Sequence, residues 1–287
     1  MLLKDVLKSA IDHLTAAGVG SPRLNAETLL MFTLSCDRAY LYAHPERDLN
    51  PEEQTRYQEA LAQRARGVPA QYITGHQEFW GMDFLVSPAV LIPRPETEHV
   101  IETVLDLLHN GGRASSAGAE LRIVDVGTGS GCIALALAKE LPQAEIHATD
   151  ISRQALEIAR ANAARHQLEN RVQFQETDLL QGLPLAYFDF VVSNPPYVGE
   201  SEADQVQLEV RKFEPRNAVF AGPTGLEVIE HLVPQAQAAL KPGGWLVMEI
   251  SGTIAEGVKR LLKSWANFRI ANDLQAIPRI AVARRPA

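Results

Sequence analysis

A buried strand, a glycine loop and a helix follow one another at residues 121–140, and this order constrains the fold more than any other feature of the chain. The apolar run Leu121–Val126 predicts the strand, and Cys132–Glu140 predicts the helix. Glycines let the backbone turn tightly beside a ligand, and the first turn of a helix offers unpaired N–H groups. The pattern predicts a ligand-binding turn at the edge of a parallel sheet. The residues of the loop are Gly127, Thr128, Gly129, Ser130 and Gly131.

A second predicted strand, Glu145–Thr149, ends at an acidic residue, Asp150. A carboxylate in that place can accept hydrogen bonds from both hydroxyls of a ribose, and its spacing from the loop is near the roughly twenty residues of a dinucleotide fold. The loop departs from the dinucleotide fingerprint, because Cys132 stands at its sixth position, where a further glycine is expected. The glycine loop alone is therefore weak evidence of function.

The tetrapeptide Asn194-Pro195-Pro196-Tyr197 directly follows another apolar run, Phe188–Ser193. Proline cannot continue a central strand, so the chain leaves the sheet at its carboxyl edge, where open α/β sheets bind ligands. The asparagine amide and nearby carbonyls can accept hydrogen bonds from a planar –NH2 group, and the tyrosine can stack on it. The alternative is an ordinary turn that ends a strand.

Composition agrees with an enzyme of the cytoplasm. The chain has 287 residues, of which 46% are hydrophobic and 22% charged, enough for a large core and two domains. No stretch has the length of a membrane span or the pattern of a signal peptide. The net charge of −8 argues against broad binding of DNA or RNA. Cys36 and Cys132 are far apart in apolar surroundings, so we expect neither a disulfide nor a metal site.

The pattern of hydrophobic residues changes twice along the chain. Residues 2–66 show helical spacing, with Asn50 and Pro51 at the start of one helix. Glycines and aromatic residues between Val68 and Thr97 predict a β-hairpin. Later segments alternate between strand and helix, which predicts a mostly parallel sheet covered by helices. Residues 110–118 predict a flexible loop, and Lys241–Gly244 a tight turn before another strand.

The glycine loop, Asp125, Asp150 and the tetrapeptide occur in the order of the class I S-adenosylmethionine-dependent methyltransferases, which the chain resembles. A narrower resemblance is to the protein-(glutamine-N5) methyltransferases that act on peptide chain release factors. It runs nearly end to end. The segments that carry it are Ala26–Leu30, Tyr72–Gly75, Glu78–Gly81, Ile92–Glu98, Asn194–Tyr197, Phe213–Pro215, Gly222–Leu226, Asp273-Leu274 and Arg279. A sister family that methylates a ribosomal protein tends to differ at Pro93–Glu98.

The resemblance implies a fold and a domain plan. The fold class is α/β, a Rossmann-like class I methyltransferase with a seven-stranded, mostly parallel sheet, a small N-terminal helical bundle and a hairpin linker. The implied domains are a helical substrate-docking domain at 1–70, the hairpin linker at 71–95 and the methyltransferase domain at 96–287. The implied substrate is the glutamine of a Gly-Gly-Gln tip of class I release factors. We expect a monomer that binds neither membrane nor nucleic acid directly.

The resemblance also implies the site. Asn194 and the backbone at Pro195 hold the glutamine amide, with Pro196 and Tyr197 beside it. The loop Gly127–Gly131 lines the cofactor, S-adenosylmethionine. Asp150 holds its ribose, and Asn194 faces both ligands. The adenine is expected near Asp178 and Leu179, where leucine replaces the aromatic residue of some members. The segment Glu249–Ile254 departs from the pattern of relatives and is left out of the predicted site.

A primary amide nitrogen is a poor nucleophile, because its lone pair is delocalised into the carbonyl. Two acceptors for its hydrogens would orient the nitrogen towards the methyl group without a dedicated general base. His147 and His166 are expected to be structural. Glu96 and Glu98 also fit a helix start, Arg94 fits an ordinary salt bridge, and Asp125 fits an orienting role.

Other functions remain open at this point. An adenine-N6 methyltransferase of DNA or RNA could use the same tetrapeptide, because its target is also a planar –NH2 group. A ribosomal-protein glutamine methyltransferase is a second alternative. A nicotinamide dehydrogenase would leave the tetrapeptide unexplained. A non-catalytic module would bind the cofactor without methyl transfer.

Overall fold

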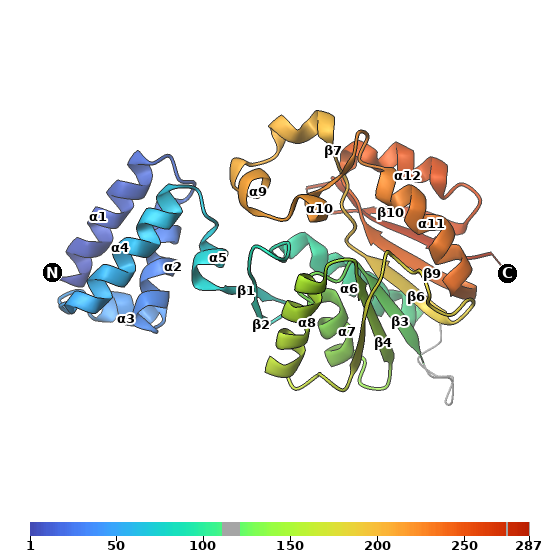
Figure 1. The fold of residues 1–287 in the computed structure, drawn as a ribbon, viewed down its shortest axis with the longest axis horizontal. Helices are drawn as coiled ribbons and strands as arrows, with labels where there is room; N and C mark the ends of the chain where they lie inside the picture. The colour runs from blue at the N-terminus through green and yellow to red at the C-terminus, as the bar shows by residue number, and fades with distance from the viewer. Residues whose placement is uncertain (111–120, 274, 287) are drawn as a thin grey trace. The chain divides into compact units, whose positions relative to one another are not determined.

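The computed structural model describes residues 1–110, 121–273 and 275–286, and the chain divides into two compact units (Figure 1). The first unit comprises Met1–His76 and Gln207–Phe213, and the second comprises Gln77–Val206 and Glu214–Ala287. The flexible loop predicted at 110–118 lies, apart from Asn110, outside the described residues. The domain boundaries of the sequence analysis stay predictions.

The first unit is helical, as its periodicity predicts. Its core is formed by apolar side chains of the first, second and fourth helices, among them Leu14, Leu30 and Leu61. Asn50 caps the fourth helix: its Oδ1 accepts from the Glu53 backbone N at 2.8 Å, and the Glu53 carboxylate accepts from Asn50 N at 3.0 Å, a capping box. The helices are α1 (Leu3–Ala16), α2 (Pro22–Leu34), α3 (Arg38–Ala43), α4 (Pro51–Ala65), α5 (Ala70–Thr74) and, from later in the chain, α9 (Leu208–Phe213).

A buried arginine joins α9 to the rest of the first unit. The Arg64 guanidinium lies 2.8 Å from the Glu209 carboxylate, and it donates to Asn25 Oδ1 at 2.7 Å and to the Val68 carbonyl at 3.0 Å. The acceptors come from three separate stretches of the chain. Helical periodicity carries no information about such a pairing, and the sequence analysis did not anticipate it.

The β-hairpin is shorter than predicted. It consists of β1 (His76–Phe79) and β2 (Met82–Leu85), joined by Trp80 and Gly81, whose φ angles of +53° and +63° suit a two-residue turn. The hairpin predicted between Val68 and Thr97 is wrong for its first residues, because Ala70–Thr74 form the single-turn helix α5. Gly75 ends that helix with a left-handed φ of +78°, a conformation that favours glycine.

The second unit contains a seven-stranded sheet in the order β10-β11-β9-β6-β3-β4-β5. The pairs from β9 to β5 are parallel, whereas β11 is antiparallel to both β9 and β10. The predicted seven-stranded, mostly parallel sheet is confirmed. Its strands are β3 (Arg122–Val126), β4 (Glu145–Asp150), β5 (Val172–Glu176), β6 (Phe188–Ser193), β9 (Leu240–Glu249), β10 (Ala266–Asn272) and β11 (Pro278–Arg284).

Helices cover both faces of this sheet (Figure 1). Residues of α6 (Glu98–Asn110), α7 (Cys132–Glu140) and α8 (Arg153–Arg165) share one apolar cluster with Ile123 and Val192 of the sheet. Residues of α11 (Glu227–Ala239) and α12 (Ala255–Leu261) share another with Val124 and Val191. Successive residues of β3 and β6 thus face opposite sides, the period of two expected for strands.

Several short elements complete the second unit. A short parallel pair joins β7 (Val198–Gly199) to β8 (Phe220–Gly222), which follows α10 (Arg216–Val219). The turn predicted at Lys241–Gly244 is instead part of β9. There the pairing with β6 shifts register between Phe188 and Phe190, and Gly243 has a φ of +77°. The strand bends at that irregularity rather than beginning after it.

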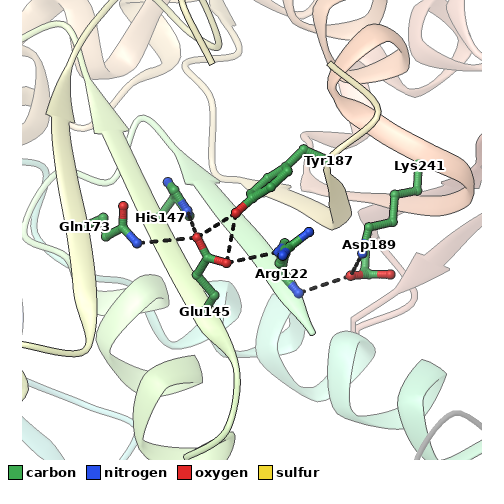
Figure 2. A network of polar contacts seen from close by, with 7 residues as sticks. All are labelled: Arg122, Glu145, His147, Gln173, Tyr187, Asp189 and Lys241. Carbon is green, nitrogen blue, oxygen red and sulfur yellow. Dashed lines mark hydrogen bonds and ion pairs between the residues drawn. The ribbon is translucent and has the colours of Figure 1, made fainter. Parts of the chain in front are cut away.

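A polar network joins the amino-terminal parts of the parallel strands, at the opposite edge from the strand ends that carry the predicted site (Figure 2). The Glu145 carboxylate accepts from Arg122 Nε at 3.0 Å and from the Tyr187 hydroxyl at 3.0 Å, and it lies 2.7 Å from His147 Nε2. Burial favours a higher pKa for Glu145, but the hydrogen bonds from these three side chains hold the pKa below its ordinary value. The contacts of His147 agree with the structural role expected for it.

A second carboxylate extends this network. Asp189 accepts from the Arg122 backbone N at 3.1 Å and from Lys241 Nζ at 2.6 Å (Figure 2). Because these residues begin β3, β4, β6 and β9, the network holds four neighbouring strands in alignment at one edge. The carboxyl ends of the strands are left for the site. No helix in the described parts of the chain combines the length and apolar composition needed to span a membrane.

Asn162 on α8 links the hairpin to the glycine loop. This fully buried side chain accepts from the Leu85 backbone N at 2.7 Å, and donates to the Leu85 carbonyl at 3.0 Å and to the Ser130 carbonyl at 2.9 Å. Through Asn162, Ser130 of the glycine loop is thereby connected to Leu85 of the hairpin.

We predict that Asn162→Ala lowers the free energy of unfolding by about 2–4 kcal/mol, because buried backbone groups lose their partners at about 1–3 kcal/mol each. Urea denaturation followed by circular dichroism measures the change. The matched substitution Asn170→Ala, at an exposed position, should cost less than about 0.5 kcal/mol. Equal effects of the two substitutions would contradict the assigned role of Asn162.

Candidate active site

A cavity of about 330 Å³ lies within the second unit. Its walls include residues that directly follow β3, β4 and β6, together with residues of the segments 89–93 and 215–220. The cavity is therefore at the carboxyl edge of the parallel strands, where the sequence analysis expected a site.

Most of the predicted site residues line this cavity. They are Gly127, Thr128, Gly129, Ser130, Asp150, Asp178, Leu179, Asn194 and Pro196. Gly131, Pro195 and Tyr197 are not among the lining residues. Gly131 precedes α7 with a φ of +83°, and a Cβ there would lie 3.2 Å from Ala159 Cβ. Close packing of α7 on α8 accounts for that glycine without a ligand.

The glycine loop faces open space. Gly127 and Gly129 have φ angles of +70° and +56°, and a Cβ at either position would meet no atom within 4 Å. These backbone angles strongly favour glycine. Behind the loop, buried Asp125 accepts from Thr128 Oγ1 at 2.6 Å and from Ala134 N at 3.2 Å through its Oδ2.

The other oxygen of Asp125 is left without a partner. Asp125 Oδ1 is buried and makes no hydrogen bond with the described residues. Burial raises the pKa of Asp125 to about 7, against the hydrogen bonds from Thr128 and Ala134. The loop thus has a carboxylate directly behind it with unused acceptor capacity.

Asp150 closes another side of the loop. Its Oδ2 accepts from Gly129 N at 2.9 Å, and its Oδ1 accepts from Ser152 N at 2.8 Å. Each carboxylate oxygen retains a lone pair for a further donor. Burial raises the pKa of Asp150, and the backbone donors oppose the rise. The next residue, Ile151, is 61% exposed although it lines the cavity, a feature that the sequence analysis missed.

The tetrapeptide is held by two residues that the sequence analysis did not place in the site. Asn194 Nδ2 donates to Thr97 Oγ1 at 3.1 Å, and Thr97 Oγ1 donates to Glu249 Oε2 at 2.6 Å. The Tyr197 hydroxyl donates to Glu249 Oε1 at 3.0 Å. Burial, reinforced by Glu249, raises the pKa of Tyr197. The sequence analysis left Glu249 out of the site, and the structure corrects this. Glu249 contacts Tyr197 directly and Asn194 through Thr97.

A sequence signal for Glu249 existed. It ends an apolar strand as Asp150 does, and β9 pairs with β6 so that Met248 lies beside Ser193. Glu249 and Asn194 are the next residues on the two strands. Thr97 had no such signal, because its 3-10 turn, Pro95–Thr97, is separate from the sheet in sequence.

Arg94 makes the salt bridge that its sequence allowed. It pairs with buried Glu214, which also accepts from Ile92 N at 3.2 Å. This pairing joins the segment around Pro93 to the segment around Pro215, and both prolines line the cavity. Glu96 is exposed, and Glu98 accepts from the Trp80 backbone N at 2.7 Å. In the described residues, no cluster of histidine, cysteine and acidic side chains is suited to a metal ion.

Comparison with known proteins identifies the family. Residues 5–75 match the family model of the PrmC N-terminal domain, and residues 109–212 match that of the methyltransferase small domain. A release factor glutamine methyltransferase of Koribacter versatilis is 57% identical, over 100% of this chain and 99% of that protein. One of Moorella thermoacetica is 42% identical, over 94% and 92%. The chain belongs to the release factor glutamine methyltransferase family.

Solved structures agree with this assignment at the level of the fold. The N-terminal domain of human METTL16 in complex with SAH has a TM-score of 0.51 at 19% identity, covering 89% of this chain and 93% of that one. A methyltransferase from Pyrococcus furiosus has a TM-score of 0.50 at 18% identity, covering 83% and 100%. The predicted class I S-adenosylmethionine-dependent methyltransferase is confirmed.

The residues of the cavity fit that cofactor in their chemistry. The loop between Gly127 and Gly129 presents backbone to open space, and Asp150 has acceptor capacity for ribose hydroxyls. Exposed apolar Ile151 and half-buried Leu179 offer surface for an aromatic base. S-adenosylmethionine carries both the ribose hydroxyls and the aromatic base that these residues could bind.

We predict that Asp150→Ala weakens S-adenosylmethionine binding on the order of 100-fold, because each hydrogen bond to a charged group contributes about 1.5–3 kcal/mol. Isothermal titration calorimetry measures the dissociation constant. Glu157→Ala removes an exposed carboxylate from α8 and serves as the control with unchanged affinity. Unchanged affinity in the Asp150 variant would remove this residue from the cofactor site.

The raised pKa of Asp125 predicts a pH-dependent stability. Between the ordinary value of 3.8 and about 7, the folded state binds more protons at this carboxyl than the unfolded state does. Its contribution to stability is therefore lost as pH rises through that window, and is level above it. In Asp125→Asn this loss should disappear, so that urea denaturation at pH 5, 6, 7 and 8 shows the variant gaining stability relative to the natural protein. Parallel curves for the two proteins would contradict the assignment.

Proposed function

We propose that this protein transfers a methyl group from S-adenosylmethionine to the side-chain nitrogen N5 of the glutamine in the Gly-Gly-Gln tip of class I peptide chain release factors. The observation that carries the proposal is the placement of Asn194. It lines the cavity beside the glycine loop and Asp150, with its amide held by Thr97. Relatives that match over nearly their full length are named release factor glutamine methyltransferases.

Asn194 and the backbone at Pro195 bind the substrate amide. When bound, S-adenosylmethionine supplies an electrophilic methyl group on a sulfonium. Asn194 Oδ1 and the Pro195 carbonyl accept hydrogen bonds from the two amide N–H groups, orient the nitrogen and increase its electron density. As the N–CH3 bond forms and the S–CH3 bond breaks, the nitrogen loses one proton to water, which leaves the cofactor as a neutral thioether. Pro196 forms part of the cavity wall. Tyr197 supports the turn through Glu249.

The cofactor is held by the loop Gly127–Gly131 and by the carboxylate of Asp150, with its adenine near Asp178 and Leu179. Two glycines of the loop keep its backbone open to a ligand. Thr149 Oγ1 donates to the Leu179 carbonyl at 2.8 Å, and so joins the two strand ends that flank the expected adenine. Asp150 orients the ribose through the acceptor capacity that its two backbone donors leave.

The partner is a protein rather than a nucleic acid. The net charge of −8 opposes binding of a polyanion, and none of the relatives compared above over nearly their full length is named for nucleic acid or for a ribosomal protein. The helical domain at 1–70 docks the release factor, and the hairpin linker at 71–95 connects it to the methyltransferase domain at 96–287. The enzyme acts as a monomer in the cytoplasm.

Asn194→Ala should lower turnover by about 10²–10³, as expected when one preorganised hydrogen-bonding group is removed. The measurement is transfer of labelled methyl from S-adenosylmethionine to a purified release factor, with the Gln→Ala tip variant and adenine-containing duplex DNA as alternative acceptors. Asn170→Ala is the matched exposed control. Label on DNA, or label that survives the Gln→Ala change, would overturn the proposed function.

A further inference from the structure

Two side chains of the tetrapeptide connect to the same buried carboxylate. Asn194 reaches Glu249 through Thr97, with distances of 3.1 Å and 2.6 Å along the chain of hydrogen bonds. Tyr197 reaches its other oxygen directly at 3.0 Å. Thr97 is 2% exposed and Glu249 is 1% exposed, so water does not compete for these bonds. Thr97 also lines the cavity beside Asn194.

This connection has a direction. An ionised carboxylate only accepts hydrogen bonds, and a threonine hydroxyl has a single proton to donate. Thr97 donates that proton to Glu249, so the Thr97 oxygen can only accept a hydrogen bond from Asn194. The end of the Asn194 side chain that faces Thr97 must consequently be the –NH2 group. Its carbonyl oxygen, Oδ1, remains as the acceptor for a ligand in the cavity.

The surroundings of Glu249 bear on its ionisation. Burial raises its pKa, and the hydroxyls of Thr97 and Tyr197 together with the charge of Arg279 oppose that rise, whereas Glu96 adds to it. Arg279 is itself held by Asp273, whose Oδ2 lies 2.9 Å from its Nε. The hydroxyl donors and the cation come from three separate elements and favour the charged carboxylate, but burial outweighs them and leaves the pKa of Glu249 raised.

We propose that Thr97 and Glu249 are positioning residues that hold Asn194 with its oxygen towards the substrate, and that this fixed orientation selects glutamine over glutamate at the reacting position. A glutamine side chain offers N–H groups to Asn194 Oδ1, whereas a glutamate carboxylate offers only acceptors and is repelled. The inference rests on the proposed function. It adds to that function the residues that fix the orientation of the Asn194 side-chain amide.

The first test compares Thr97→Val with Thr97→Ser. Valine keeps the shape of the side chain without the hydroxyl, so the Asn194 amide becomes free to turn over. Turnover should fall by about 10- to 100-fold, and a release factor with glutamate at its tip should become a stronger competitive inhibitor by about tenfold. Serine retains the hydroxyl, so Thr97→Ser should keep most of the turnover and most of the original inhibition constant of the glutamate-tipped factor. Thr103→Val, at a half-buried threonine of α6 that does not line the cavity, is the control without effect on either quantity.

The inhibition constant separates positioning from simple destabilisation. A loosened fold would weaken the binding of both release factors, whereas a turned amide weakens one and strengthens the other. Equal turnover and an unchanged ratio of glutamine to glutamate binding in Thr97→Val would overturn the inference. If the natural protein transfers no methyl group to release factors, the proposed function itself fails, and that result is distinct from an inactive variant beside an active natural protein.

A second test reverses the direction of the hydrogen bonds. Asn194→Asp should lose at least about 100-fold in turnover, because its carboxylate meets a hydroxyl already committed to Glu249. Adding Glu249→Gln supplies an N–H donor to Thr97, which can then donate to the aspartate at position 194. The double variant should regain about tenfold, and Asn194→Asp with Glu249→Met, which removes the charge without a donor, should not. Circular dichroism of each variant verifies its fold. Equal recovery in the two double variants, or recovery in neither, would contradict the proposal.

Discussion

The parallel pairing of β4, β3, β6 and β9 is the constraint on which the rest of the site depends. Its register places Val126 beside both Thr149 and Ser193, and Ser193 beside Met248. The residue that follows each of these is Gly127, Asp150, Asn194 or Glu249. A shift of one strand by a single residue would turn every side chain of that strand to the other face of the sheet. The polar network at the opposite edge keeps the four strands aligned.

Burial raises the pKa of Asp125, Asp150 and Glu249, and hydrogen-bond donors beside each carboxylate oppose that rise. Asp125 has Thr128 and a backbone N–H, Asp150 has two backbone N–H groups, and Glu249 has two hydroxyls. Unpaired charges in such places would be strongly destabilising. Of these three carboxylates, Asp150 lines the cavity and keeps acceptor capacity there, which suits recognition of hydroxyl groups.

The sequence correctly predicted the cavity residues that come directly after a strand. The glycine loop, Asp150 and Asn194 each come immediately after an apolar run, so the topology of an α/β sheet predicts their common edge. The same reasoning could have found Glu249, but a departure from the family pattern outweighed it. It could not have found Thr97 or the Arg94–Glu214 pair, because those contacts join segments more than ninety residues apart in the chain.

The sequence by itself determined the kind of fold, the edge of the sheet at which the cavity lies and most of the residues that line it there, because periodicity and glycine or proline placement act locally. Only the tertiary structure decided how those residues are oriented. The direction of the Asn194 amide depends on Thr97 from a distant turn and on Glu249 from another strand. The placement of α9 with the helices of the first unit likewise depends on Arg64. Hydrogen bonds between side chains that are far apart in the chain produce no periodic pattern of hydrophobic and polar residues in the sequence.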